Sequence, residues 1–391
     1  MMTVRVGIIG VGCMGTAHAR CIAADEIKGM TLTAVCDTAK AAREAATVFC
    51  PGIFLYERYD ELIQSGVVDA VIIATPHKLH ADIAVFALKH GLHVMTEKPV
   101  DITVSKARIL NETAQKSGKV FGIMFNQRTD ERFSRAREIL QSGQLGSLKR
   151  TVWIITNWYR TQSYYESSDW RATWDGEGGG VLINQAPHNL DLWQWICGMP
   201  VSVAAWCDEG KYHDIQVEDD ATIFARFENG ATGTFITTTG EYPGTNRLEI
   251  AGTLGKLVIE NGVLKHWRLK EKEDEIRFSA NESAPEIAIE YTEFVPEWAS
   301  AAHAVILQNF ANAVLKGEKL LAPGAEGINQ LMITNAAYLS SWRGGQMVEI
   351  PFDEALFDKL LTEHAKESPH GSHTTVQNTG DGYSDRWQIK W

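Results

Sequence analysis

The stretch that decides the fold is VRVGIIGVGCMGTAH, at residues 4–18. Its first half is apolar and rich in β-branched residues, which predicts a strand buried on both faces of a parallel sheet. The G-x-G-x-x-G spacing of Gly10, Gly12 and Gly15 allows a tight turn, close approach to a pyrophosphate, and close packing of the next helix. That helix is expected at residues 14–24, and its N-terminus would favour a bound phosphate. The stretch therefore predicts a dinucleotide-binding turn.

A second apolar strand is predicted at residues 30–36, and it ends on Asp37. A carboxylate there can accept hydrogen bonds from the 2′- and 3′-hydroxyls of an adenosine ribose and would repel a 2′-phosphate. The separation from Gly10 is longer than the usual 20 or so residues. Because Lys40 and Arg43 on the following helix could offset the repulsion, the pattern favours NAD over NADP without excluding NADP.

The composition bounds the class of protein. The 391 residues predict two domains, and an apolar content of 45% is enough for two cores. A net charge of −12 argues against nucleic acid or an anionic membrane as the main partner. The six cysteines form no C-x-x-C pair, which is typical of a reducing compartment. With neither a signal peptide nor a long apolar run recognisable, a cytoplasmic location is expected.

Strands and helices alternate up to residue 127, which predicts a doubly wound parallel sheet in a first domain, residues 1–127. Further elements of this domain are expected as helices at 39–49, 78–90 and 103–117 and strands at 67–74, 93–96 and 120–125.

A second domain, residues 128–366, follows a different pattern. Between residues 201 and 279 only strands and turns are predicted, with hairpins at Asn229-Gly230 and Asn261-Gly262. This predicts an α+β domain with a large open sheet, mostly antiparallel. Its other elements are expected as helices at 132–141, 298–315, 326–342 and 353–364 and strands at 149–157 and 347–350. A polar tail occupies residues 367–391.

Two short motifs carry reactive side chains. Lys98 lies in Glu97-Lys98-Pro99 at the carboxyl end of a predicted parallel strand, where open sheets bind ligands. A partly desolvated lysine there can polarise a substrate oxygen, although a solvated surface lysine remains the alternative. After a run of three glycines, Asn184 and His188 are four residues apart and would share one helical face with Asp191. His188 suits acid–base work, or could be a core histidine bonded to Asp191.

A loop of aromatic residues between Trp153 and Trp174 could stack on sugar C–H faces while arginines and tyrosines bind hydroxyls. Core packing or a subunit interface would explain the same residues. The spaced pairs His77/His80 and His370/His373 have no further ligands nearby, so no metal site is predicted. No G-x-S-x-G nucleophile motif is present.

Taken together, these residues resemble the Gfo/Idh/MocA oxidoreductase family. The resemblance rests on GVGCMG at 10–15, ATPHKLH at 74–80, TEKP at 96–99 and GGGVLINQAPHNLD at 178–191, and it extends to about residue 351. It implies an N-terminal Rossmann domain that binds NAD or NADP and a C-terminal α/β domain that closes the site and often forms the dimer interface. The family's acidic residue four positions before the histidine is Asn184 here.

The resemblance implies roles for particular residues. Lys98, His188 and Asn184 are expected to be catalytic. The expected cofactor-binding residues are Gly10, Gly12, Cys13, Met14, Gly15, Asp37, Thr38, Thr75, Pro76, His80, Glu97, Lys98 and Asn126. The expected substrate-binding residues are Lys98, Arg128, Tyr164, Trp170, Arg171, Asn184 and His188.

The leading interpretation is an NAD(H)-dependent dehydrogenase that oxidises a secondary hydroxyl of a sugar, sugar derivative or cyclitol. One alternative is a glycosidase-like enzyme that uses NAD for transient oxidation. The other is a non-enzymatic nucleotide-sensing regulator on the same fold. A homodimer or homotetramer is expected, because alternating strands such as residues 221–227 can offer one face to a partner and residues 386–391 could dock on a neighbour.

Overall fold

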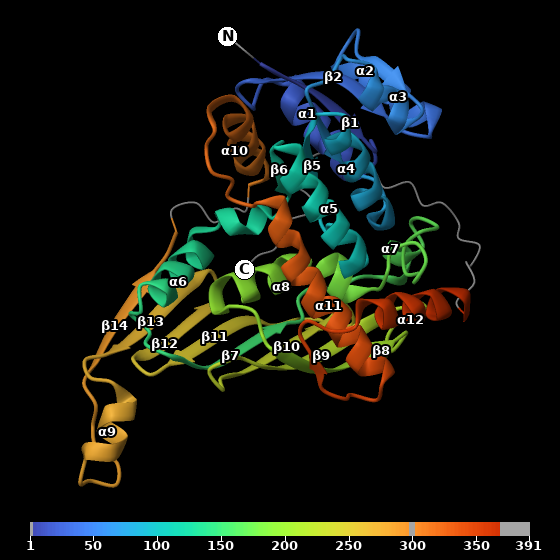
Figure 1. Ribbon diagram of the computed structural model, residues 1–391. Helices are drawn as coiled ribbons and strands as arrows, with labels where there is room; N and C mark the ends of the chain where they lie inside the picture. The colour runs from blue at the N-terminus through green and yellow to red at the C-terminus, as the bar shows by residue number, and fades with distance from the viewer. Residues whose placement is uncertain (1–2, 297–301, 368–391) are drawn as a thin grey trace.

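The computed structural model describes residues 3–296 and 302–367, which form two sheets with helices around and between them (Figure 1). The first sheet is parallel throughout, in the order β3-β2-β1-β4-β5-β6. Its strands are β1 (Val4–Ile9), β2 (Met30–Cys36), β3 (Phe54–Tyr56), β4 (Ala70–Ile73), β5 (His93–Thr96) and β6 (Phe121–Ile123). This is the strand order of a dinucleotide-binding sheet, so the predicted doubly wound fold is confirmed.

The helices that cover this sheet are α1 (Cys13–Ala23), α2 (Lys40–Phe49), α3 (Tyr59–Gln64), α4 (His80–Lys89) and α5 (Val104–Ser117), with short 3-10 turns at His77–Leu79 and Asn126–Thr129. The sequence analysis missed β3 and α3, because both are short and the apolar residues of β3 form a run of only a few positions at the edge of the sheet. The strands predicted at 67–74 and 120–125 are shorter in the structure.

The second sheet has nine strands in the order β14-β13-β12-β11-β7-β10-β9-β8-β15. Only β7 and β10 are parallel neighbours, so the predicted open, mostly antiparallel sheet is confirmed. Its strands are β7 (Leu148–Ile155), β8 (Ser202–Glu209), β9 (Glu218–Arg226), β10 (Thr232–Thr238), β11 (Asn246–Gly252), β12 (Gly255–Glu260), β13 (Val263–Leu269), β14 (Ile289–Phe294) and β15 (Val348–Glu349).

Both predicted hairpins are present in this sheet. Asn229-Gly230 joins β9 to β10, and Asn261-Gly262 joins β12 to β13. Asn261 has φ of 51° and Gly262 has φ of 81°. Two successive residues with positive φ are typical of the type I′ turn, whose twist matches that of the strands.

Helices of the second half lie mainly between the two sheets, as Figure 1 shows for α8 and α11. They are α6 (Glu131–Gln141), α7 (Gln162–Tyr165), α8 (Pro187–Cys197), α9 (Glu273–Ser279), α10 (His303–Lys316), α11 (Gly327–Trp342) and α12 (Glu354–Glu367), with a π-helix at Val181–Gln185 and a 3-10 turn at Gly324–Glu326. Helix α10 packs on the first sheet's side of the molecule, where the Gln308 side chain exchanges two hydrogen bonds with the Lys28 backbone.

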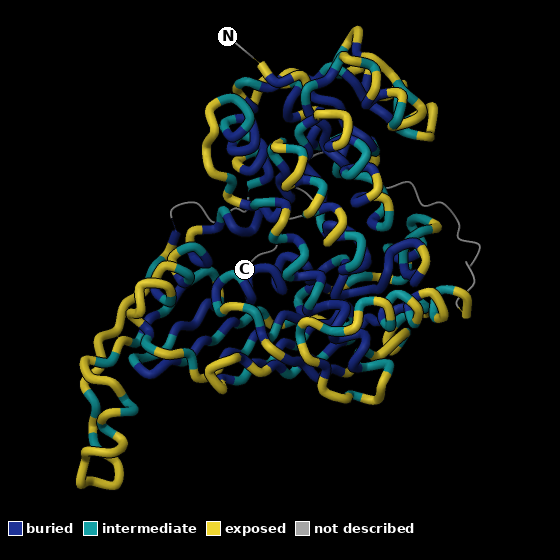
Figure 2. The backbone as a smooth tube through the Cα atoms, in the orientation of Figure 1, coloured by how far each residue is buried: buried dark blue, intermediate teal, exposed yellow. Residues whose placement is uncertain are grey.

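Helix α9 corrects the expectation that residues 201–279 hold only strands and turns. It is short, contains no buried residue, and projects with the ends of its neighbouring strands away from the rest of the fold (Figure 2). Without an apolar face its sequence carries no helical periodicity, so local ion pairs such as Arg277–Glu273 support it instead.

The inner face of the second sheet carries much of the core. Trp153 of β7 and Phe235 of β10 lie side by side and are fully buried, and the tilted ring of Trp193 of α8 lies 5.6 Å from that of Phe235. The predicted alternation at residues 221–227 is confirmed, since its odd-numbered members are all buried. The tail from residue 368, including His370, His373 and residues 386–391, and the first residues of the helix predicted at 298–315 lie outside the described residues.

Candidate active site

The turn after β1 is shaped for a phosphate. Gly10 has φ of +88°, and a Cβ there would lie 2.6 Å from the Ala74 carbonyl oxygen. A Cβ on Gly15 would lie 1.8 Å from the Gly10 carbonyl oxygen, so α1 can pack this closely only without a side chain. At Gly12 a Cβ would meet nothing within 4 Å, and no side chain caps α1, which begins at the next residue. The turn thus leaves open space at a helix N-terminus, as a pyrophosphate requires.

Asp37 lies at the carboxyl end of β2 and also holds this turn. One carboxylate oxygen accepts the Val11 N–H at 2.9 Å, and the other accepts the Ala39 N–H at 2.9 Å. Arg43 donates to the backbone carbonyls of Asp37 and Thr38, at 2.6 and 3.0 Å, and pairs with Glu57. The Arg43 guanidinium is therefore already bound to protein acceptors, which compete with a 2′-phosphate for its hydrogen bonds.

The turn after β4 is tied to the turn after β5 by His80. Its two ring nitrogens lie 2.7 Å from the Pro99 carbonyl oxygen and 2.8 Å from the Thr75 carbonyl oxygen. His80 is buried, so these contacts fix two adjoining turns at the same edge of the sheet. Thr75 and Pro76, both expected in the cofactor site, lie within the first of these turns.

Lys98 follows β5 and reaches the second half of the chain. Its Nζ donates to the Asn184 carbonyl oxygen at 2.7 Å. Burial lowers the pKa of Lys98 to about 8, although the charge of Glu97 raises it. The Glu97 carboxylate lies 2.7 Å from His18 Nε2, on α1, and accepts the Lys98 N–H. Burial disfavours the Glu97 charge, but the His18 hydrogen bond and nearby positive charges outweigh it and hold the pKa of Glu97 at about 2.

His188 lies in the first turn of α8 and is buried. Its Nδ1 has no hydrogen-bond partner among the residues that the structure describes. Burial and the charge of Lys98 lower the pKa of His188 well below its usual value. A neutral imidazole next to a cationic lysine can accept a proton from a hydroxyl at neutral pH.

The predicted common helical face is wrong for Asn184, which lies outside α8, whereas His188 and Asp191 are three positions apart on that helix, as predicted. Pro187 occupies the first position of α8, where its missing N–H costs nothing, and Asn184 lies before it in the π-helix. Asp191 does not bond His188 but accepts two hydrogen bonds from Arg128, at 2.6 and 2.8 Å. The open alternative of a core histidine held by Asp191 is thereby excluded.

Arg128, expected to bind substrate, is buried between two carboxylates. Its guanidinium is 1% exposed and lies between Asp191 and Glu326. The paired carboxylates offset the cost of burying this charge. The arginine thereby links α8 to the 3-10 turn that precedes α11. Asn126, just before it, lies 3.4 Å from His303 Nδ1, on α10.

The aromatic loop divides between core and site. Trp158 and Trp174 are buried in the core. Arg171 lies over the rings of Tyr164 and Trp170, at 4.7 and 4.8 Å, and Trp170 meets the His77 ring edge-on. Three of the predicted substrate-binding residues therefore gather in one cluster beside Glu177.

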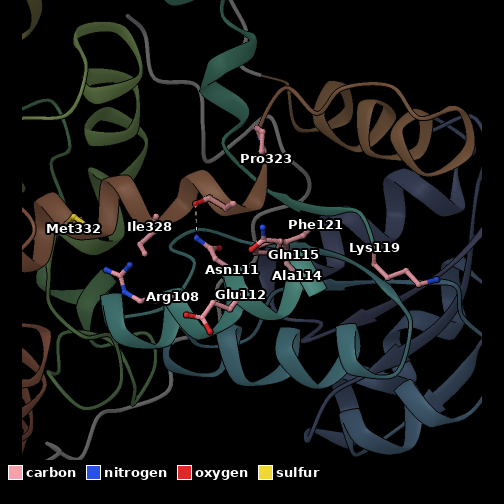
Figure 3. A pocket seen from close by; sticks show the side chains of 11 residues that line it. Arg108, Asn111, Glu112, Ala114, Gln115, Lys119, Phe121, Pro323, Ile328 and Met332 are labelled. Carbon is pink, nitrogen blue, oxygen red and sulfur yellow. Dashed lines mark hydrogen bonds between the residues drawn. The ribbon is translucent and has the colours of Figure 1, made fainter. Parts of the chain in front are cut away.

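The surface pocket in Figure 3 is a different place. It has a volume of about 620 Å³ and lies between α5 and α11, where Asn111 donates to the Ala325 carbonyl oxygen. Phe121, at the start of β6, lines it. The pocket therefore lies toward the amino end of β6, whereas the reactive side chains follow the carboxyl ends of the strands.

Within residues 3–296 and 302–367 no helix is long and apolar enough to cross a membrane. The same two segments hold no group of three or more His, Cys, Asp or Glu side chains that could bind a metal ion.

Comparison with known proteins finds a family model for each half of the chain. A model described as oxidoreductase family, NAD-binding Rossmann fold, matches residues 4–125, and a Gfo/Idh/MocA C-terminal domain model matches residues 133–258. The chain belongs to the Gfo/Idh/MocA oxidoreductase family. Membership confirms the predicted family, the class of enzyme and NAD as the cofactor.

Relatives in this family span different lengths of the chain. It is 30% identical over 198 residues to the rhizopine catabolism protein MocA of Rhizobium meliloti, covering 51% of this chain and 58% of that protein. It is 24% identical over 361 residues to the scyllo-inositol 2-dehydrogenase (NAD(+)) of Bacillus subtilis, covering 90% and 98%. The WlbA dehydrogenase of Bordetella pertussis, solved with NADH and UDP-GlcNAcA, shares the fold with a TM-score of 0.75 at 24% identity, covering 90% and 100%.

Sequence reasoning missed two buried carboxyls of this family member's site. Glu177 contacts Asn184, and Glu218 accepts the N–H groups of Gly180 and Leu182 at 2.8 and 2.9 Å. Glu177 stands inside the glycine run Gly-Glu-Gly-Gly-Gly, and a charged residue within such a run was a usable signal. Glu218 begins β9 and carried no such signal.

Proposed function

We propose that this protein is an NAD(H)-dependent dehydrogenase that oxidises a secondary hydroxyl of a sugar, sugar derivative or cyclitol. The observation that carries the proposal is the 2.7 Å hydrogen bond from Lys98 Nζ to the Asn184 carbonyl oxygen, which joins the nucleotide-binding half to the turn that leads into His188. The named function of the Bacillus subtilis relative, an inositol dehydrogenase that the match covers almost completely, supports the substrate class.

The residues have separable roles. NAD, when bound, supplies the hydride acceptor. His188 takes the proton of the reacting hydroxyl, because burial and the neighbouring charge keep its imidazole neutral. Lys98 donates a hydrogen bond to the same oxygen and polarises it. The turn formed by Gly10 and Gly12, with Gly15 allowing α1 to pack closely behind it, holds the pyrophosphate, and Asp37 binds the adenosine ribose.

The aromatic cluster is suited to a polyol. Tyr164 and Trp170 offer ring faces for sugar C–H groups, and Arg171 lies between them as a donor. Among residues 3–296 and 302–367 no helix covers the outer face of the open second sheet (Figure 1), which supports a homodimer or homotetramer.

A screen of NAD reduction over inositols, aldoses and glycosides tests the function. We expect turnover of at least one polyol, and a loss of kcat/KM of about 10²- to 10⁴-fold in Lys98→Ala and in His188→Ala. Lys119→Ala, in the distant pocket, is the matched control and should match the wild type. Near-native kcat/KM in both site variants would overturn the assignment. Product without net NADH would favour transient oxidation instead, and binding of nucleotide without turnover across the panel would favour a regulator.

A further inference from the structure

Asn184 takes the position that the family commonly gives to an acid, and the structure places a different acid against it. The Asn184 Nδ2 atom donates to Glu177 Oε1, and it also lies 3.4 Å from the Tyr164 hydroxyl. A carboxylate can only accept hydrogen bonds, so the amide nitrogen must face Glu177. With both amide hydrogens directed at these two oxygens, the Oδ1 atom of Asn184 faces away from them.

Glu177 is itself held from several directions. It is 1% exposed, its Oε2 atom accepts the Ala172 N–H at 2.7 Å, and Arg171 lies 3.7 Å from Oε1. Its backbone carbonyl accepts a hydrogen bond from His77 Nδ1 at 3.0 Å, which ties it to the nucleotide-binding half. Burial raises the pKa of Glu177, and the Arg171 charge and the donors on its oxygens oppose that shift, so each donor helps to hold the carboxylate as a fixed acceptor.

Tyr164 completes the arrangement. Its hydroxyl oxygen accepts hydrogen bonds from Arg171 at 2.8 Å and from Gln185 at 3.0 Å. Together with the longer contact from Asn184 Nδ2, these donors all point at the oxygen, so the hydroxyl hydrogen is directed away from them and can donate. A donor and the Asn184 Oδ1 acceptor side by side can pair with a substrate hydroxyl, which both accepts and donates.

From these contacts we infer that Glu177 is a positioning residue that locks the Asn184 amide with its oxygen toward the substrate. Asn184 then offers the substrate an acceptor, as an aspartate there would. The negative charge lies on Glu177, behind Asn184 as seen from the substrate. This inference rests on the proposed polyol dehydrogenase function. It also predicts that the family's usual acid is harmful at position 184 in this chain, because two carboxylates would then face each other in a buried place.

A reciprocal swap tests the inference. Asn184→Asp sets two acceptors against each other, and Glu177→Gln leaves two amides that can rotate; each should lower kcat/KM at least about tenfold, mainly through a higher KM. The double variant Glu177→Gln/Asn184→Asp restores one donor and one acceptor with the donor on the other side. It should recover kcat/KM to within about threefold of the wild type, which independent sites would not do.

A measurement without substrate separates this inference from the proposed function. In thermal melts of the cofactor-free protein, Asn184→Asp should melt below the wild type at pH 8, and the gap should close on acidification as a carboxylate takes up a proton. The double variant should melt near the wild type at both pH values. Asp175→Asn, which removes a half-exposed carboxylate from the same loop, is the control and should show neither effect.

The outcomes are distinct. If the wild type oxidises no polyol, the proposed function fails, and the melts alone decide whether Glu177 holds Asn184. If Asn184→Asp retains wild-type kcat/KM and melting behaviour, or if the double variant is no better than the poorer single variant in both measurements, the inference is overturned.

Discussion

The ammonium group of Lys98 has a pKa that burial lowers and the charge of Glu97 raises, and the activity should therefore depend on pH. Burial lowers the pKa of Lys98 to about 8, so above this pH the group loses the positive charge with which, in the proposed mechanism, it polarises the substrate oxygen. We expect kcat/KM for polyol oxidation to fall as pH rises through about 8. In Lys98→Arg, whose guanidinium stays protonated, the fall should disappear even if the enzyme is slower. Profiles from pH 6 to 10 measure both, and an unchanged alkaline fall in the arginine variant would contradict the assignment.

Asp37 is the residue that we propose decides the choice of cofactor. Its carboxylate favours ribose hydroxyls and repels a 2′-phosphate, and Arg43 is already engaged by two backbone carbonyls and Glu57. We expect NAD to bind at least about tenfold more tightly than NADP, roughly 1.4 kcal/mol, by calorimetry. Asp37→Ser should weaken NAD binding and relieve the exclusion of NADP. Because Asp37 also holds the Val11 N–H, melting of the cofactor-free variant is the control. Equal affinities in the wild type would show that a basic residue outweighs Asp37.

At the scale of elements, Glu218 attaches the start of the π-helix, which leads into α8, to the second sheet. This buried carboxyl of β9 accepts the N–H groups of Gly180 and Leu182 and, at 2.7 Å, the hydroxyl of Tyr338 on α11. Burial raises the pKa of Glu218 to about 8 against the effect of these donors. Each of these hydrogen bonds therefore offsets part of the cost of burying the Glu218 carboxyl.

Tyr338→Phe tests this attachment. Removing one donor from a buried carboxyl should lower the free energy of unfolding by about 1–3 kcal/mol. Urea denaturation measures the change, and Tyr242→Phe, at a tyrosine that is 83% exposed, should change it by less than about 0.5 kcal/mol. A loss no larger in Tyr338→Phe than in the control would mean that Glu218 does not need this hydroxyl.

At the scale of the whole molecule, the outer face of the second sheet carries an apolar patch. We define it as Val152, Ile154, Phe224, Ile236 and Trp206. In the sheet register Ile154 lies opposite Ile236, and Trp206 lies two strands further along the same row, so these side chains share one face. Trp206 is 55% exposed in the single chain, and the other four are half-buried. A group of apolar side chains on one sheet face, interrupted only by threonines, is typical of an interface.

We expect light scattering at micromolar concentration to show a dimer or tetramer. Ile236→Glu should shift the population to monomer, because the new charge would be buried at the interface without a partner. Val48→Glu, on an exposed position of α2, should leave the assembly unchanged. A wild type that is wholly monomeric would contradict the prediction.

The sequence by itself determined the features that depend on neighbours along the chain. The glycine spacing at residues 10–15 sets the nucleotide turn, alternation at residues 221–227 sets a strand face, and Asn261-Gly262 sets a hairpin, because each follows from local backbone geometry. Lys98 was found because the carboxyl end of a parallel strand is where such sheets bind ligands.

Only the tertiary structure decided which distant side chains meet. Arg128 pairs with Asp191 across 63 positions, and His18 meets Glu97 across 79, so neither pairing leaves a periodic signal in the sequence. The contact of Asn184 with Glu177 spans only seven positions, yet it depends on how a glycine run and a π-helix fold back on each other. Side-chain partners of this kind are set by packing, whereas a sequence pattern reports only the path of the backbone and the face that is buried.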